Sequence, residues 1–212
     1  MEILNNVKIQ IPDEVIRNSI FVLDSNSFAI YVYLKYKYFR NHNNTEIELD
    51  ITELKDTLHI TDNRTLKKCL IKLHDNNIIV ERIEKLPTRK IMTISFIPDL
   101  FITATFTQLP ATILNKIDVI GTTGMRLLFY YESFVNRNDR LERQFAFPSL
   151  LTIGKALNIN KDTVIEYNRI LHSNDLVSII KHELKHDGEY NEQNKPQFIK
   201  YNNHYRVQVQ NL

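Results

Sequence analysis

The stretch LHITDNRTLKKCLIKLHDNNII, residues 58–79, decides the fold of this chain. After a polar turn, apolar residues recur at spacings of three and four, which predicts a helix over 63–75 with one buried face. These apolar positions are Leu66, Leu70 and Leu73. The asparagines that follow suit the left-handed backbone that ends a helix. With a shorter helix predicted just before the turn, the stretch is typical of a helix-turn-helix.

The same pattern occurs a second time, in LNINKDTVIEYNRILHSNDLV at residues 157–177. The apolar positions stay in register with the first copy at an offset that varies only between 97 and 99. Two polar positions also match, because Thr65 aligns with Thr163 and His74 aligns with His172. A recurrence at a nearly fixed period indicates an internal repeat.

A second pair of segments extends the repeat toward the start of the chain. IPDEVI at residues 11–16 matches LPATIL at residues 109–114, at a constant offset of 98. The two copies therefore cover most of the sequence. We predict two related modules, residues 1–98 and 99–212, divided near Pro98.

Each module has the same predicted order of elements. A helix is followed by a short strand, a short helix, the turn, the helix of the repeat, and two β-rich runs that form a hairpin. In the first module the ranges are 25–39, 46–49, 51–58, 63–75, and 78–83 with 90–96; in the second they are 122–135, 144–147, 149–157, 161–173, and 176–181 with 198–209. Candidate caps of the first helices are Asp24-Ser25 and Thr122-Thr123. We predict an α+β, mainly helical fold of two tandem winged-helix domains, each a helix-turn-helix with a β-hairpin wing.

The composition excludes several classes of protein. With 43% hydrophobic and 25% charged residues among 212, the chain has the composition of a folded globular protein. No apolar stretch approaches the roughly 18 residues that span a bilayer, and the start lacks a signal-peptide pattern. We expect a cytoplasmic protein with no membrane association. Its single cysteine, Cys69, lies in an apolar helical pattern and is predicted to be a buried free thiol.

Glycine is scarce, which bears on cofactors. The four glycines do not have the spacing of a phosphate-binding loop, which needs close approach of the backbone to the phosphates. Nucleotide-driven enzymes are therefore disfavoured. We expect no cofactor.

The formal charge of +2 permits a polyanionic partner without requiring one, so the distribution of cations decides. In the first module cations occur on the third helix, at the wing tip and at the end of the first helix. The predicted DNA-contacting residues are Asn63, Arg64, Lys67, Lys68, Lys72, Lys85, Arg89 and Lys90. The patch on the first helix comprises Lys35, Lys37 and Arg40. We expect this module to make the main contact with double-stranded DNA, its third helix in the major groove.

The second module is less suited to phosphate. Its third helix sets two cations, Lys161 and Arg169, against Asp162, Glu166 and Asp175. We predict that Lys161 and Arg169 make a weaker second DNA contact, or that this module binds a partner protein. Aromatic residues of the first helices are predicted to fill the core and the interface between modules, with a dimer seam as the alternative. They are Phe28, Tyr31, Tyr33, Tyr36, Phe129, Tyr130 and Tyr131.

One motif suggests enzymatic chemistry. Residues 182–186 fit the pattern H-E-x-x-H, in which two histidines one helical turn apart bind zinc and the glutamate acts as general base. The preceding run favours β structure, and on a strand such histidines lie about 13 Å apart, too far to share an ion. We therefore predict an exposed polar wing, with no metal site and no enzymatic activity.

These features resemble the tandem winged-helix proteins of plasmid and phage replication in low-GC Gram-positive bacteria. That class includes replication initiators and the winged-helix part of DnaD-type primosomal proteins. The likeness lies in three segments and their second copies, at 11–16, 60–66 and 76–79. It implies binding of double-stranded DNA, commonly with formation of a homodimer. In many two-winged initiators the second module recognises the DNA repeats, whereas here the first is the more basic.

Two alternatives stay open. A transcriptional regulator or repressor of a mobile element would bind DNA with the same surfaces. A tandem winged helix can instead be a protein-interaction scaffold, as in the kleisin-binding partners of chromosome-condensing complexes. Such scaffolds tend to be acidic, so the cations of the first module favour DNA.

Overall fold

The computed structural model describes residues 3, 7–20, 22–87, 91–98, 105–135, 137, 144–182, 185–190, 196–199 and 202–212, with the backbone alone for 185–190 and 196–199. Helices and small antiparallel sheets alternate along the chain, which confirms an α+β, mainly helical fold. The first half contains β1 (Lys8–Pro12), α1 (Asp13–Ile16), α2 (Ser25–Arg40), β2 (Glu46–Asp50), α3 (Ile51–Leu58), α4 (Asn63–Asp75) and β3 (Ile91–Ser95).

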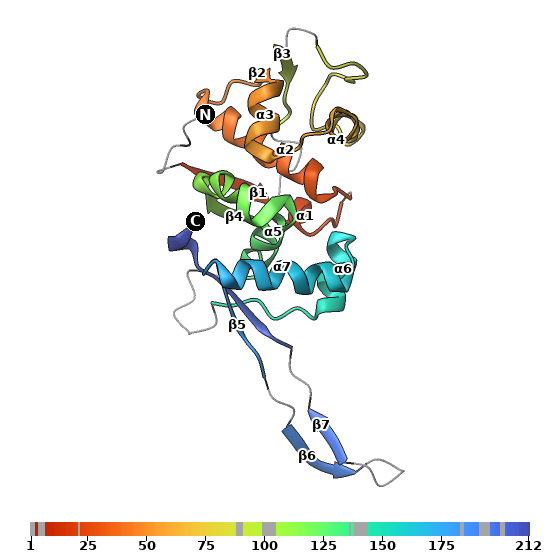
Figure 1. The fold of residues 1–212 in the computed structure, drawn as a ribbon, viewed down its shortest axis with the longest axis vertical. Helices are drawn as coiled ribbons and strands as arrows, with labels where there is room; N and C mark the ends of the chain where they lie inside the picture. The colour runs from red at the N-terminus through yellow and green to blue at the C-terminus, as the bar shows by residue number, and fades with distance from the viewer. Residues whose placement is uncertain are drawn as a thin grey trace.

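The second half repeats much of this order. It contains β4 (Phe106–Pro110), η1 (Ala111–Lys116), α5 (Ile117–Glu132), α6 (Leu150–Leu157), α7 (Lys161–Ser173), β5 (Val177–Ile180), β6 (Lys185–Tyr190), β7 (Pro196–Ile199), β8 (His204–Val207) and η2 (Val209–Asn211). In Figure 1 the two halves lie one above the other, and a long hairpin that ends in β6 and β7 extends away from the second half.

Side-chain caps set where the paired helices begin. Asp50 and Asp62 each accept two backbone N–H groups at the start of α3 and α4, and Asn160 accepts one at the start of α7. These bonds satisfy amides that have no partner within the helix. At the helix ends Asn77 and Asp175 adopt the left-handed backbone, with φ of 56° and 55°. The predicted bounds of α3, α4 and α7 are confirmed.

The two halves meet through the segments that carry the start of the sequence repeat. β1 pairs antiparallel with β4, and Gln10 lies opposite Gln108 at the centre of the ladder. Those two positions differ by the repeat offset of 98, so the ladder is symmetric about their midpoint. Such reciprocal pairing is the property of an interface with two-fold symmetry. The halves are thus related by a pseudo-two-fold axis through this sheet, which lies between them in Figure 1.

The first long helices of the two halves show the same reciprocity. The Thr122 hydroxyl bonds Asn26 Oδ1 at 2.7 Å, and the Thr123 hydroxyl bonds the Ser25 hydroxyl oxygen at 3.1 Å. The rings of Phe28 and Phe129 meet edge to face behind these contacts. The seven aromatic residues singled out in the sequence analysis are all buried, which confirms that they fill the core and the interface between halves. One continuous hydrophobic cluster includes residues of both halves, and Cys69 lies within it as a buried free thiol.

Three predictions of local structure are corrected. β3 pairs with β2, and the predicted hairpin of 78–83 with 90–96 is reduced, among the described residues, to the antiparallel Ile79–Phe96 bridge. The predicted helix 122–135 follows a break at Gly121, where φ is 62°, but it ends at Glu132, and α5 has a further turn that begins at Ile117 before the break. The predicted second strand, 144–147, is reduced to a single bridge between Ala146 and Tyr205.

The long second hairpin agrees with its prediction where the two can be compared, since β5 pairs with β8. Beyond it, β6 pairs with β7. Among the described residues, no helix has the length and apolarity that crossing a membrane requires.

Candidate nucleic-acid interface

Helix α4 separates its apolar and cationic residues onto two faces. Leu66, Leu70 and Leu73 are buried against the core. Asn63, Arg64 and Lys68 are exposed, and Lys67 is half-buried. The cations therefore lie on the outer face at the N-terminal half of the helix, where a helix entering the major groove contacts base edges.

Neighbouring residues orient this face. The carboxylate of Asp62 accepts the Arg64 and Thr65 N–H groups and so fixes the first turn of α4. The Lys55 ammonium, from α3, donates to Asn63 Oδ1 at 2.9 Å. In the part of the chain that the structure describes, Arg64, Lys67, Lys68 and the exposed Lys85 make no ion pair. The predicted contacts Arg89 and Lys90 lie outside the described residues.

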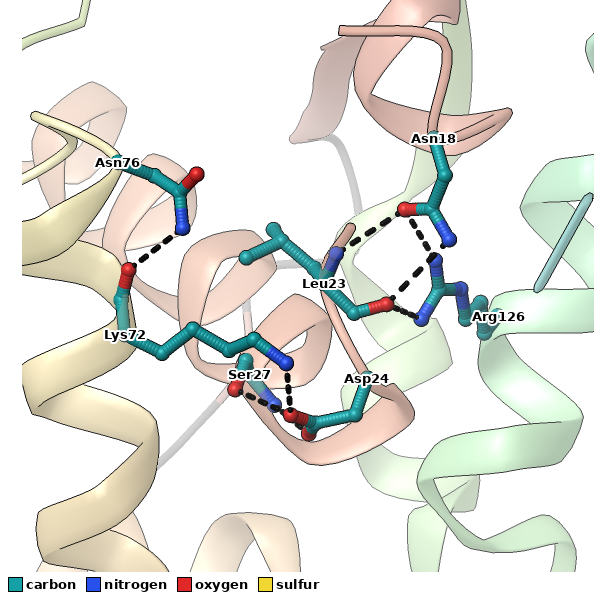
Figure 2. Close-up of polar contacts among 7 residues, drawn as sticks. All are labelled: Asn18, Leu23, Asp24, Ser27, Lys72, Asn76 and Arg126. Carbon is teal, nitrogen blue, oxygen red and sulfur yellow. Dashed lines mark hydrogen bonds and ion pairs between the residues drawn. The ribbon is translucent and has the colours of Figure 1, made fainter. Parts of the chain in front are cut away.

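Lys72 lies on the same helix but is engaged internally. Its ammonium pairs with Asp24 Oδ2 at 3.0 Å, and Asp24 caps the start of α2 by accepting the Ser27 N–H, which confirms it as a helix cap. Figure 2 shows the Lys72 side chain extending from α4 toward this carboxylate. Partial burial raises the pKa of Asp24, but the hydrogen bonds from Ser27 and Lys72 outweigh it and leave the pKa below its ordinary value. Lys72 therefore links α4 to α2 through a half-exposed ion pair.

A buried arginine holds the loop before α2, and the sequence analysis did not identify it. Arg126, on α5, is fully buried and donates to the Leu23 carbonyl and, at 2.7 Å, to Asn18 Oδ1. Its guanidinium also lies 5.3 Å from the centroid of the Phe28 ring. Burial lowers the pKa of Arg126 to about 10 because desolvation penalises the charged form. Figure 2 shows this contact next to the Asp24–Lys72 pair. The loop before α2 therefore contacts α5 of the second half through Leu23 and α4 of the first half through Asp24.

The basic patch predicted at the end of the first helix does not form as expected. Lys35 is buried, and its ammonium donates to the Pro98 carbonyl at 2.8 Å. Lys37 pairs with Glu53 on α3, also at 2.8 Å. Of the three cations only Arg40 is exposed. Two of the three cations thus serve packing between elements.

Helix α7 is the counterpart of α4 and has a mixed outer face. Lys161 and Arg169 are exposed, as are Asp162 and Glu166. A cavity of about 390 Å³ lies beside the start of α7, lined in part by Lys155 and Lys161. The outer face of α7 thus mixes cations with acids, whereas the outer face at the start of α4 carries cations, as the sequence predicts.

The segment that matches the zinc-protease pattern is not a helix where it is described. His186 lies in β6, which pairs with β7, while Glu183 and Leu184 lie outside the described residues. Within the described ranges no group of three or more candidate ligands is placed to hold a metal ion.

Comparison of the chain with protein-family models and with curated protein sequences finds no match. The assignment of function therefore depends on the surface itself. The most distinctive part of the molecular surface is the cationic outer face of α4, which we define by Asn63, Arg64, Lys67 and Lys68.

Proposed function

We propose that this chain is a sequence-specific double-stranded DNA-binding protein built from two tandem winged-helix modules. The observation that carries the proposal is the cationic outer face of α4, where Arg64 and Lys68 are exposed one helical turn apart. Both side chains extend from a helix whose opposite face is buried. Side chains at this place suit contacts to the base edges of a major groove and to the phosphates that flank it.

The arrangement of the halves supports binding by a single chain. Because the β1–β4 ladder is symmetric about Gln10 and Gln108, we infer that the same pseudo-two-fold axis relates α4 to α7. In a symmetric dimer two recognition helices are related in this way, and each contacts one half of the DNA site. We infer that α4 makes the dominant contact and that α7, with Lys161 and Arg169 beside two acids, makes a weaker one or contacts a partner protein.

The resemblance to winged-helix proteins of plasmid and phage replication suggests the biological setting. We propose a role in replication initiation or its control, by binding rather than by catalysis. A repressor of a mobile element would use the same surface. A DNA target next to an origin, rather than a promoter, distinguishes the two roles.

Selection of bound fragments from a random duplex library tests this proposal. The wild-type chain is expected to enrich one sequence motif. Arg64→Ala and Asn63→Ala are expected to relax that motif at a few positions, since base contacts specify sequence, whereas Arg89→Ala with Lys90→Ala lowers affinity for all sequences alike. Arg169→Ala, on α7, is the matched control with a smaller effect. Enrichment of the same motif by wild type and Arg64→Ala, or no enrichment at all, contradicts the proposal.

A further inference from the structure

The root of the second hairpin exposes aromatic side chains that a β-strand usually buries. Ala146 joins β8 through two backbone hydrogen bonds with Tyr205, of 2.8 and 2.7 Å, and both residues are buried. Because successive side chains of an extended chain alternate between faces, Phe145 and Phe147 lie on the opposite, outer face. Phe147 is 63% exposed.

The packing beneath the hairpin root concerns the buried side chains on the face opposite Phe145 and Phe147. Tyr205 stacks on Tyr131 of α5, with ring centroids 4.4 Å apart, and so fills the space below the strands. The small side chain of Ala146 lies buried on the same inner face. The equivalent strand of the first half, β2, has the opposite arrangement, since Ile47 and Leu49 are buried. Packing thus accounts for the small inward residue, but it does not account for aromatic rather than polar residues on the outer face.

The outer face forms a preassembled set of rings. Phe145 stacks on His204 with centroids 3.9 Å apart and an interplanar angle of 13°. Phe147 stands edge to face against both rings, and His182 meets His204 at 4.2 Å. Ile180, which is 54% exposed, lies opposite His204 in the β5–β8 ladder. We call this surface the aromatic face and define it by Phe145, Phe147, Ile180, His182 and His204.

The charge around the aromatic face is positive. The segments that build it, residues 144–149, 176–182 and 202–208, contain two exposed cations, Lys181 and Arg206, and no aspartate or glutamate. Arg206 follows His204 by two positions in β8 and therefore shares its face. The corresponding outer face of the first half instead exposes Glu46 and Glu48. Exposed rings beside cations are the combination that binds single-stranded nucleic acid, in which bases stack on the rings and cations contact the backbone. A protein partner does not require this charge.

We propose that the aromatic face binds the unpaired bases of single-stranded nucleic acid, with Phe147 stacking on a base and Arg206 contacting a phosphate. Bases in a duplex are stacked on one another and do not offer their faces to such a surface. The site is separate from α4, so it does not rest on the proposed binding of duplex DNA.

A tryptophan placed at the site tests the proposal directly. The chain contains no tryptophan, so Phe147→Trp introduces a single indole that keeps an aromatic ring at the site. Addition of an oligothymidine or an oligouridine of about 20 nucleotides, longer than a usual site of about 4–16, is expected to quench its emission to saturation. Comparison of the affinities for the two oligonucleotides shows whether the site binds single-stranded DNA or RNA more tightly. A duplex of equal length is expected to cause no quenching.

A second variant measures the contribution to affinity. Phe147→Ser is expected to weaken binding of a labelled single strand about tenfold by fluorescence anisotropy, within the range for loss of one stacked base. Ile91→Ser, at an exposed position of β3 in the first half, is the matched control and is expected to leave binding unchanged. Arg64→Ala is expected to affect duplex binding alone, so failure of this proposal and failure of the α4 assignment are separate results.

Two outcomes overturn the proposal. One is the absence of quenching by either single strand in a Phe147→Trp variant with wild-type circular dichroism. The other is a wild-type dimer in sedimentation that Phe147→Ser converts to a monomer without any single-strand binding, which would make the aromatic face a contact between copies of the chain.

Discussion

Arg126 shows how one buried charge organises contacts between the halves. It lies in a run of apolar residues on α5 and donates from the second half to Leu23 and Asn18 of the first. A charged residue within an apolar helix is the sequence signal that identifies such a position, because arginines are almost never fully buried without partners. Its partners come from a loop about a hundred positions away, so periodicity alone does not predict them.

We predict that Arg126→Met destabilises the protein. Methionine preserves much of the aliphatic volume but leaves the Leu23 carbonyl and the Asn18 amide without a charged donor, and a hydrogen bond to a charged group contributes about 1.5–3 kcal/mol. The expected decrease in the free energy of unfolding in urea is about 3 kcal/mol. Arg169→Met, at an exposed position, is the control and should change it by less than about 0.5 kcal/mol. Equal stability of the two variants would show that the buried bonds contribute nothing.

Asp24 makes one stability contribution depend on pH. Its pKa is below the ordinary 3.8, so the unfolded chain binds the proton more readily than the folded chain. The contribution is therefore present above pH 3.8 and lost as the pH falls through the folded pKa. Asp24→Asn, which retains a capping oxygen, is expected to cost on the order of 0.5 kcal/mol at neutral pH, because the pair with Lys72 is half exposed.

Urea titrations of both proteins between neutral pH and about pH 3 measure this effect. The gap between wild type and Asp24→Asn should close as the pH falls, and Lys72→Met should behave in the same way. A gap that stays constant with pH would show that the carboxylate charge is not involved.

At the scale of elements, the turn between α6 and α7 is shorter than its counterpart between α3 and α4. A Cβ at Gly154 would lie 2.8 Å from the carbonyl oxygen of Ile159, a backbone atom that cannot move without shifting the turn. The aligned position of the first half is Lys55, which carries a side chain. Both turns join helices of similar length, and the second turn, residues 158–160, is one residue shorter than the first, residues 59–62.

We predict that Gly154→Ala is destabilising even though alanine favours helices by about 1 kcal/mol over glycine. The clash with backbone should outweigh this gain and give a net loss of about 1–2 kcal/mol, since overpacking costs about 1–3 kcal/mol. Thermal unfolding followed by circular dichroism measures it. Lys55→Ala is the matched control, expected to be near neutral, and a stabilised Gly154→Ala protein would contradict the close approach.

Elements with strong periodicity were predictable from sequence, and strand partners were not. The bounds of α3, α4 and α7 follow from apolar spacing and caps that act within the segment itself. The pairing of β3 with β2, rather than with residues 78–83, depends on which segment the folded chain brings next to β3, and β2 is distant from it in sequence. The outward orientation of Phe147 depends on the Tyr131–Tyr205 stack, and a one-residue shift of register reverses every side chain of a strand.

At the scale of the whole molecule, the sequence repeat predicts the similarity of the halves but not how they associate. The pairing of β1 with β4 and the contacts of α2 with α5 give the chain one continuous core. The cations at the end of α2 illustrate the limit: Lys35 and Lys37 form part of a basic patch in the sequence, yet their partners Pro98 and Glu53 draw them into the packing.

We predict that the halves unfold as one unit. Phe28→Ala removes the edge-to-face contact with Phe129 across the interface and is expected to cost about 3–5 kcal/mol, as for other large-to-small changes in a core. Circular dichroism and tyrosine fluorescence should report one shared transition in urea for both proteins. Two separate transitions in the wild type would show that the halves are independent domains.

The most direct test of the central claim, that α4 contacts the phosphates of a DNA duplex, is the salt dependence of duplex affinity measured by anisotropy. Each phosphate neutralised contributes about −0.9 to the slope of log K against log salt. The account predicts steep salt dependence for the wild type, a slope shallower by about 2 for the double variant Lys67→Ala, Lys68→Ala, and an unchanged slope for Lys72→Met, whose ammonium is held by Asp24. A double variant with the slope and affinity of the wild type would contradict it.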